Sequence, residues 1–152
     1  MSKTVQQLLD VKGRKIFTVS PDTTVLDALR LMAKHRIGSV LVQESDGSLC
    51  GIMSERDYAR KVELQGKTAA NTRVSEIMTS RVLVVHPQDP VERCMAQMTS
   101  KRLRHLPVVD KDRVVGIISI GDVVRSVIAD QEFLLDQLET YIMGHQVQIP
   151  DE

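Results

Sequence analysis

Apolar and polar residues follow a definite order of elements along the first half of the chain. Pro21 ends a short apolar run, and a helix is then expected from a cap at Thr23 to about His35. Apolar residues recur at i, i+4 and i+7 along this helix, at Val25, Leu29 and Met32. Three strands are predicted in this half, at Ile16–Val19, Ser39–Gln43 and Leu49–Met53. Asp46–Gly47 is a turn between the last two strands, and a closing helix runs from Ser54 to about Gly66.

The second half repeats this order of elements. Asp89 is expected to cap its first helix, with Pro90 at the first helical position and Glu92 at the third. The other predicted elements are three strands, a turn and a second helix, at Leu83–Val85, Leu106–Val109, Val114–Ile118, Lys111–Asp112 and from Ser119 onward. The pattern therefore predicts β-α-β-β-α twice, an α/β (α+β) fold built from two copies of one unit.

A short motif, Gly-x-x-Ser-x-x-Asp, closes each copy where the last strand becomes a helix. The motif residues of the two copies lie 65 positions apart: Gly51, Ser54 and Asp57, then Gly116, Ser119 and Asp122. Upstream, the copies match at a distance of 66 positions, as Pro21 and Pro87 show, because one residue drops out between the copies at the turn. Two motifs in matched contexts indicate a duplicated site.

Serine and aspartate at this spacing suit the phosphate and the ribose of a nucleotide. A helix N-terminus presents unpaired N–H groups and a partial positive charge, and a serine there adds a hydroxyl for a phosphate oxygen. The aspartate lies one turn along the helix, and a carboxylate accepts both hydroxyls of a ribose. The competing interpretation is a capping box, in which the serine caps the helix and the acid reaches back. The two interpretations are compatible, since the serine can cap the helix when the site is empty.

The element order, the two motifs and the segment Ser75–Thr79, which opens the second copy, resemble paired cystathionine-β-synthase (CBS) domains. The resemblance covers about Val11 to Ala129. The residues from Ser54 to Tyr58 and from Ser119 to Arg125 are similar to those of small stand-alone tandem CBS proteins, which lack a fused enzyme or channel. The resemblance implies that the two repeats pair about a pseudo-twofold axis, that their clefts bind adenine nucleotides, and that two chains assemble into a flat dimer.

The expected nucleotide contacts lie on the motifs and on the strands beside them. The stretches Gly38–Val40 and Arg104–Leu106 are expected to supply an apolar slot with backbone groups for adenine. The full set of candidate residues is Gly38, Ser39, Val40, Ser54, Arg56, Asp57, Thr79, Arg104, His105, Leu106, Ser119 and Asp122.

The two clefts are not expected to be equal. Arg56 in the first copy corresponds to Gly121 in the second, so a charged contact to phosphate is expected at the first cleft only. Conversely, Gly38 and Ser39 in the first copy correspond to Arg104 and His105 in the second. Basic residues also close the first helix of each copy: His35 and Arg36, then Lys101 and Arg102. They either neutralise phosphates or complement the helix dipole without any ligand.

Composition excludes several classes of function. The 20 basic and 20 acidic residues balance, so no long-range field attracts nucleic acid or an anionic membrane. The N-terminus has no signal-peptide run, and no stretch is long enough to span a membrane. Cys50 and Cys94 are isolated, which suggests a reducing, cytoplasmic setting and residues that serve packing. We expect no metal site, because histidine and cysteine form no ligand-spaced cluster, and no catalytic residues.

The end of the chain predicts an amphipathic helix over 131–143, with Gly144 ending it. Its apolar face consists of Leu134, Leu135, Leu138, Tyr141 and Ile142. This face is expected either to fold back on its own domain or to pair with the same helix of a second chain. The predicted organisation is an N-terminal segment (1–15), repeat 1 (16–66), a linker (67–74), repeat 2 (75–130) and a C-terminal helix and tail (131–152).

These observations predict a non-enzymatic regulatory module, a cytoplasmic homodimer that binds adenine nucleotides and signals their level to an unknown effector protein. AMP is the first choice of ligand, with NAD(H), ATP, ADP and S-adenosylmethionine as alternatives. The dimer is expected to form through the helices that follow Thr23, Ser54, Asp89 and Ser119. The competing hypothesis is a protein-interaction module that regulates a partner enzyme and whose nucleotide clefts are vestigial.

Overall fold

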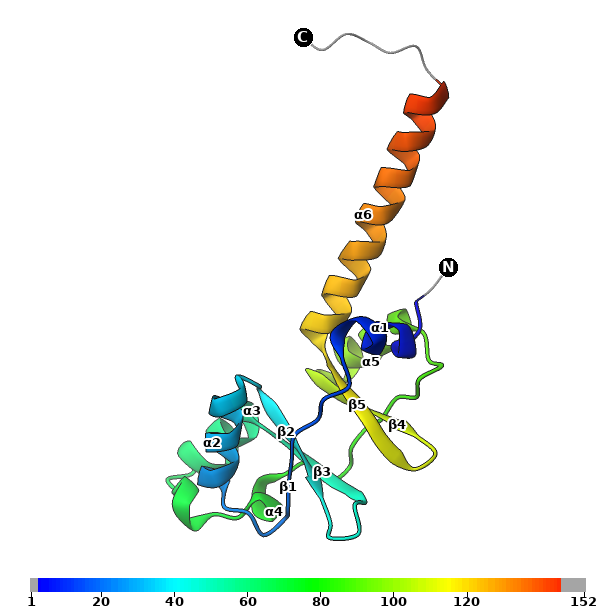
Figure 1. Ribbon diagram of the computed structural model, residues 1–152. Coiled ribbons are helices and arrows are strands. Elements are labelled where there is room, and N and C mark those ends of the chain that lie inside the picture. The colour runs from blue at the N-terminus through cyan, green and yellow to red at the C-terminus, as the bar shows by residue number, and fades with distance from the viewer. Residues whose placement is uncertain (1–2, 146–152) are drawn as a thin grey trace.

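The computed structural model describes residues 3–145, which form two lobes and a long helix that projects from one of them (Figure 1). Each lobe corresponds to one copy of the repeat and has its own cluster of buried apolar residues. The sheet of each lobe is covered by helices that contribute one apolar face. The prediction of a mixed α/β (α+β) fold with two repeats is confirmed.

The first lobe contains a three-stranded sheet in the order β1-β2-β3, formed by Thr18–Val19, Ser39–Gln43 and Leu49–Ser54. β1 pairs with β2 in parallel, and β2 pairs with β3 antiparallel. Between β1 and β2 the chain forms α2 (Val25–His35), whose buried face packs with the sheet. After β3 come α3, a π-helical turn and a 3-10 turn, at Glu55–Tyr58, Ala59–Glu63 and Ala69–Asn71.

The second lobe is built on a hairpin of β4 (His105–Asp110) and β5 (Arg113–Ser119), with α5 (Val91–Lys101) against it. The two turn residues, Lys111 and Asp112, have φ values of 52° and 64°. Positive φ at both positions is the geometry of a tight two-residue hairpin turn, as the sequence predicted. β5 leads directly into α6 (Ile120–His145), which leaves the lobe after its first turns (Figure 1).

The two repeats exchange their leading helices. α1 (Val5–Lys12) packs into the core of the second lobe, whereas α4 (Val74–Ile77) packs into the core of the first. The backbone hydrogen bonds that make these joins are equivalent: Val91 N–H to the Lys3 carbonyl at 2.9 Å, and Val25 N–H to the Thr72 carbonyl at 2.8 Å. The exchange carries the segment after α1 from the second lobe to the first (Figure 1), so that its residues lie between the repeats.

The predicted caps of the two repeat helices were wrong. Thr24, not Thr23, caps α2, and its side chain accepts a hydrogen bond from the Asp27 N–H. Pro90, not Asp89, is the cap residue of α5. The Asp89 carboxylate instead accepts a hydrogen bond from the His86 N–H at 2.8 Å. The Lys3 carbonyl accepts the hydrogen bond from Val91, the first N–H of α5. The exchanged N-terminal segment therefore replaces the side-chain cap that the local sequence predicted.

The strand predicted at Leu83–Val85 is reduced to one isolated parallel bridge between Val85 and Val108. In the first lobe the equivalent pairing includes a hydrogen bond from the Leu41 N–H to the Phe17 carbonyl. Pro107 occupies the position of Leu41 in the second lobe and has no N–H to donate, so the ladder cannot extend.

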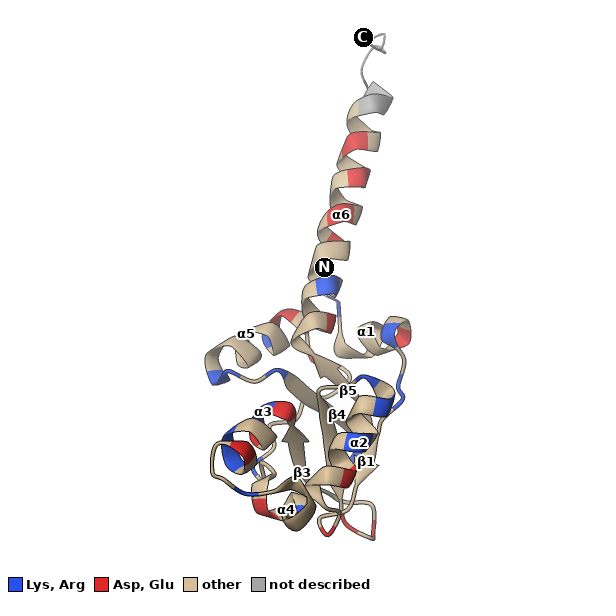
Figure 2. Cartoon of the chain, turned by 90° about the vertical axis from the view of Figure 1, so that its left-hand side faces the viewer, with Lys and Arg blue, Asp and Glu red and all other residues tan. Residues whose placement is uncertain are grey.

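The helix predicted over 131–143 is the outer part of α6, continuous with the helix that follows Ser119. Gly144 does not end it, because α6 runs to His145. A single glycine in a helix costs only about 1 kcal/mol, which the helix tolerates. The outer part does not fold back on its own lobe: it stands clear of both lobes in Figures 1 and 2.

Candidate functional site

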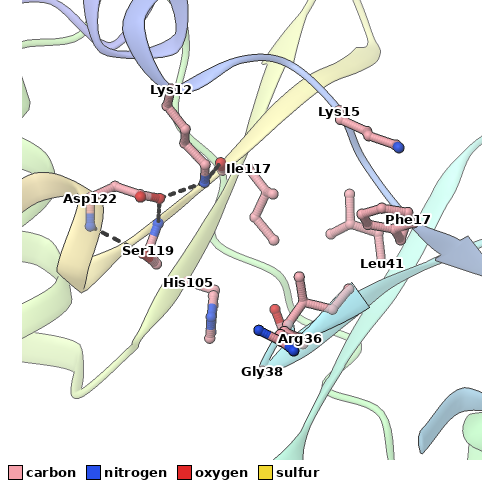
Figure 3. Close-up of a pocket in the computed structure, with 12 residues that line it drawn as sticks. Lys12, Lys15, Phe17, Arg36, Gly38, Leu41, His105, Ile117, Ser119 and Asp122 are labelled. Atoms are coloured by element: carbon pink, nitrogen blue, oxygen red, sulfur yellow. Dashed lines mark hydrogen bonds and ion pairs between the residues drawn. The ribbon is translucent and has the colours of Figure 1, made fainter. Parts of the chain in front are cut away.

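A cavity of about 310 Å³ lies between the two lobes (Figure 3). The first repeat contributes Arg36, Gly38 and Ser39, from the end of α2 and the start of β2. The second repeat contributes His105, Ser119 and Asp122, from β4, β5 and the first turn of α6. The segment at and after the end of α1 adds Lys12, Lys15 and Phe17. A ligand in this cavity would therefore contact both repeats and the connection between them.

The second motif forms the reciprocal bonds of a capping box. Ser119 N–H donates to the Asp122 carboxylate at 2.8 Å, and Asp122 N–H donates to the Ser119 hydroxyl at 3.1 Å. The next N–H, that of Ile120, donates to the Arg104 carbonyl at 2.8 Å. These bonds fix the serine and the aspartate at the helix N-terminus, beside the cavity.

Lys12 reaches from the end of α1 into the same site. Its ammonium lies 2.5 Å from the Asp122 carboxylate and 2.5 Å from the Ile117 carbonyl. Arg125, one turn along α6, bonds the other oxygen of Asp122 at 2.7 Å. The side chain of Asp122 is only 10% exposed, so these two cations compensate a largely buried charge.

Electrostatics keep Asp122 ionised and His105 neutral. Burial would raise the pKa of Asp122, but hydrogen bonds from Lys12 and Ser119 outweigh it and hold the pKa below 3.8. Burial lowers the pKa of His105 below 6.5, as does the Lys12 ammonium, while the Asp122 carboxylate opposes them. At neutral pH the cavity thus contains one carboxylate, a neutral imidazole and the cations of Lys12, Lys15 and Arg36.

The first motif has the same backbone geometry and a different set of cations. Ser54 N–H donates to the Asp57 carboxylate at 2.9 Å, and Asp57 N–H donates to the Ser54 hydroxyl at 3.1 Å. Glu55 N–H donates to the Gly38 carbonyl at 3.1 Å, as Ile120 does to Arg104. Lys61, on the same helical segment, lies 3.2 Å from Asp57. The capping-box interpretation is confirmed for both motifs.

A second hollow, an open groove of about 510 Å³, brings together Arg56, Arg102 and Arg104. Arg102 and Arg104 occupy the positions that Arg36 and Gly38 occupy in the first repeat, 66 residues earlier. No acidic residue lines this groove. The three guanidinium groups make it suitable for a phosphate or another anion.

Arg36 and Arg102 share an unusual backbone conformation. Both end their helices in the left-handed region, with φ values of 54° and 55°. Glycine is the usual residue in this conformation, which costs other residues about 1 kcal/mol or more. The side chain of Arg36 lines the cavity and that of Arg102 lines the groove.

The structure places five of the predicted site residues around the cavity: Gly38, Ser39, His105, Ser119 and Asp122. Arg56 and Arg104 lie at the groove, while Ser54 and Asp57 form the capping box of α3. The side chains of Val40 and Leu106 are buried in the two cores, 1% and 0% exposed, so only their backbone can meet a ligand. Thr79 exchanges backbone hydrogen bonds with Ile52 in β3. Which of these residues bind a ligand stays a prediction.

The sequence analysis missed Lys12, Lys15 and Phe17. Two signals pointed to the helix that ends at Lys12 and precedes the other two residues: the pair Thr4 and Gln7, which forms a capping box, and the apolar residues that follow at helical spacing. The ring of Phe17 stacks on His35 with centroids 3.9 Å apart, and Lys15 lies 5.3 Å from the Phe17 centroid.

The described residues give little support for a metal site, a membrane span or a reactive cysteine. No cluster of three potential metal ligands occurs among them, and none of their helices is long and apolar enough to cross a membrane. Burial raises the pKa of the Cys94 thiol to about 11, so this thiol is not reactive at neutral pH. Cys50 is only partly buried, and its thiol donates to the Val42 carbonyl at 3.3 Å.

The chain belongs to the CBS-domain family. A family model of the CBS domain matches it twice, at residues 9–64 and 74–129. The mitochondrial CBS domain-containing protein CBSX3 of Arabidopsis thaliana is 36% identical, an alignment that covers 94% of this chain and 73% of CBSX3. YhcV of Bacillus subtilis is 34% identical over 74% of this chain and 79% of its own length. Because CBSX3 is mitochondrial, the cytoplasmic location of this chain stays a prediction.

Solved structures share the fold. A CBS-domain protein from Burkholderia ambifaria matches with a TM-score of 0.81 and 51% identity, over 85% of this chain and 96% of that one. The CBS domain pair of protein MJ0100 matches with a TM-score of 0.76 and 27% identity, over 86% and 99%. The MJ0100 structure contains 5′-methylthioadenosine and S-adenosylmethionine. The chain is thus a pair of CBS repeats, a module of the regulatory kind.

Proposed function

We propose that the chain is a regulatory module without catalytic activity that binds an adenine nucleotide in the cavity at Ser119 and Asp122. The observation that carries the proposal is the meeting of both repeats at this cavity: the second motif faces Gly38 and Ser39 of the first repeat. Its volume of about 310 Å³ lies at the lower end of the range of small-molecule sites.

The charges of the cavity support a ligand that carries phosphate. Lys12, Lys15 and Arg36 outnumber the one carboxylate among the lining residues. This excess of positive charge favours AMP, the first choice, and the other adenine nucleotides over S-adenosylmethionine, whose sulfonium group is itself a cation. NAD(H) presents the same adenosine phosphate with a second phosphate attached. The basic residues near the second motif would suit this second phosphate.

Asp122 would accept the ribose hydroxyls in this proposal, and Lys12 would have to yield at least part of its contact with the carboxylate. Lys12 lies at the end of α1 and Asp122 in the first turn of α6. Replacement of Lys12 by ribose as the partner of Asp122 would therefore alter the contact between these helices. The ligand would act by population shift, since it would favour whichever relative placement of the lobes it can bridge.

A thermal-shift panel tests the proposal. AMP, ATP, NADH and S-adenosylmethionine are added separately, each in large excess over the protein. A ligand at about 100 times its dissociation constant stabilises the folded state by about 2.7 kcal/mol, so at least one of the phosphate-bearing ligands should raise the Tm by several degrees. If none of the four changes the Tm, the clefts are vestigial and the protein-interaction hypothesis gains instead.

A further inference from the structure

Exposed apolar side chains concentrate on α6. Of the ten large hydrophobic residues that the described chain exposes, eight lie on this helix, whereas none lies on α2 or α5. Scattered exposed apolar residues are normal, but a contiguous set on one element marks an interaction surface. The exposed face of this helix therefore needs a partner, and the described part of the single chain does not provide one.

Five of these residues form one line along the helix. Val124, Ile128, Leu135, Leu138 and Ile142 alternate at spacings of four, seven, three and four residues, and Gln131 fills the gap of seven. We call these six residues the α6 stripe. The alternation of four and three is the pattern by which two helices pack side by side. Val124 and Ile128 remain 41% and 47% exposed, so the stripe begins at the lobe and continues uninterrupted to the outer end.

The charges beside the stripe are unevenly distributed along α6. Arg125 lies near the base of the helix, and Glu132 and Glu139 follow it on the same flank at intervals of seven. Every charged residue from Ser126 to Ile142 is acidic, and Figure 2 shows red and no blue on this part of the helix. Along this flank, Arg125 near the base and Glu139 near the outer end complement a copy of the helix that runs the opposite way.

We propose that α6 pairs antiparallel with α6 of a second copy of this chain through the α6 stripe. The stripe is symmetric about its midpoint, so an antiparallel pair places Val124 opposite Ile142 and Ile128 opposite Leu138 of the second copy. In the same register, Arg125 faces Glu139 of the second copy at both ends of the pair. The stripe spans 19 residues, or about 27 Å of helix.

Two alternative partners fit less well. A parallel pair would place Arg125 of both copies at the same end, far from either Glu139. It would also place the acidic outer halves of the two helices side by side, where they repel each other. An anionic membrane surface attracts basic helices, whereas the outer part of α6 carries four acidic residues, Asp130, Glu132, Asp136 and Glu139. The pairing does not depend on nucleotide binding.

The test measures assembly of the full chain by light scattering at tens of micromolar. The wild-type protein should have at least twice the chain mass of 17.0 kDa. The double variant Leu135→Asp with Leu138→Asp should weaken assembly about a hundredfold or more, because it places two charges from each chain, four per pair, in the apolar contact. Phe133→Asp is the matched control: Phe133 is 62% exposed on the opposite side of α6, and its replacement should leave the mass unchanged.

Disulfide trapping tests the direction of the pair. Ile128→Cys mixed with Leu138→Cys should cross-link rapidly between chains, and neither variant should cross-link efficiently with itself. Efficient self-linking of each variant would overturn the antiparallel arrangement. A wild-type mass of one chain, or a mass that the double aspartate substitution leaves unchanged, would overturn the proposal entirely, and a partner other than a second copy would then have to cover α6.

Discussion

The two copies of the motif share their backbone and differ in their surroundings. In both, the serine and the aspartate bond each other across the first turn of a helix, at distances that agree within about 0.1 Å. Asp57 contacts one cation, Lys61, which follows it on the same helical segment. Asp122 contacts two, and one of these, Lys12, comes from a helix 110 residues earlier in the chain.

This difference shows how a duplicated motif can acquire two unequal surroundings. The local motif sets the positions of serine and aspartate, and it does so equally well in both repeats. The exchanged helices and the residues before each strand decide which charges surround the motif. In the second repeat they place the motif in a cavity with Lys12, Lys15 and Arg36, while the groove brings Arg56 of the first repeat together with Arg102 and Arg104 of the second. The predictions below test this inequality.

The largest effect is expected from the aspartates themselves. Asp122→Asn should abolish AMP binding in the cavity, because the loss of a charged acceptor for two ribose hydroxyls costs on the order of 3 kcal/mol or more. Asp57→Asn should leave that binding intact and remove only binding at the first motif. Calorimetry measures both, and circular dichroism controls for folding. Unchanged affinity and stoichiometry in both variants would exclude the ribose assignment.

Arg56 should distinguish the phosphate preference of the two clefts. Arg56→Ala is expected to weaken AMP at the first cleft tenfold to a hundredfold, because a charge-assisted hydrogen bond contributes about 1.5–3 kcal/mol. Adenosine has no phosphate, and its affinity should barely change. Parallel titrations of the two ligands provide the measurement. An equal loss for AMP and adenosine would mean that Arg56 shapes the pocket and does not read the charge.

Arg36 and Arg102 should have the same effect on stability and different effects on binding. Replacement of either by glycine relieves the left-handed strain and should raise the free energy of unfolding by about 1 kcal/mol. Arg36→Gly should also weaken AMP in the cavity, whereas Arg102→Gly should leave the cavity unaffected. Urea denaturation and calorimetry check the two parts, and Arg36→Lys is a control that keeps the charge and the strain. A loss of stability in both glycine variants would contradict the strain argument.

His105 predicts a smaller dependence on pH. Its folded pKa lies below 6.5, so the unfolded chain binds the proton first, and stability should fall as pH drops from 6.5 toward that lower value. A phosphate near the imidazole raises its pKa, so AMP binding should take up protons and tighten a few-fold as pH falls. Calorimetry in two buffers of different ionisation enthalpy measures the uptake. His105→Gln should remove it, and an unchanged uptake in that variant would assign the protons elsewhere.

The repeat, the element order and the motif geometry could be predicted because they depend on local rules. Apolar spacing located α2 and α5, and the reciprocal bonds of Ser54 and Asp57 follow from residues three apart. The errors arose where distant segments decide the outcome. Lys3 displaced Asp89 as the partner of the first N–H of α5, and Pro107 removed the ladder that Leu83–Val85 needed. Lys12 could not be predicted as a site residue, because only the exchange of α1 brings it close to Asp122.

The central claim is that an adenine nucleotide binds between the repeats at the second motif, and amide chemical-shift mapping with AMP tests it most directly. The account predicts that the largest shifts fall on Ser119 to Asp122 and on Gly38 and Ser39, with smaller shifts at Lys12 and Lys15. The same titration with Asp122→Asn should leave these amides unmoved. The absence of shifts in the wild-type protein at millimolar AMP, or shifts confined to residues away from both motifs, would contradict the account.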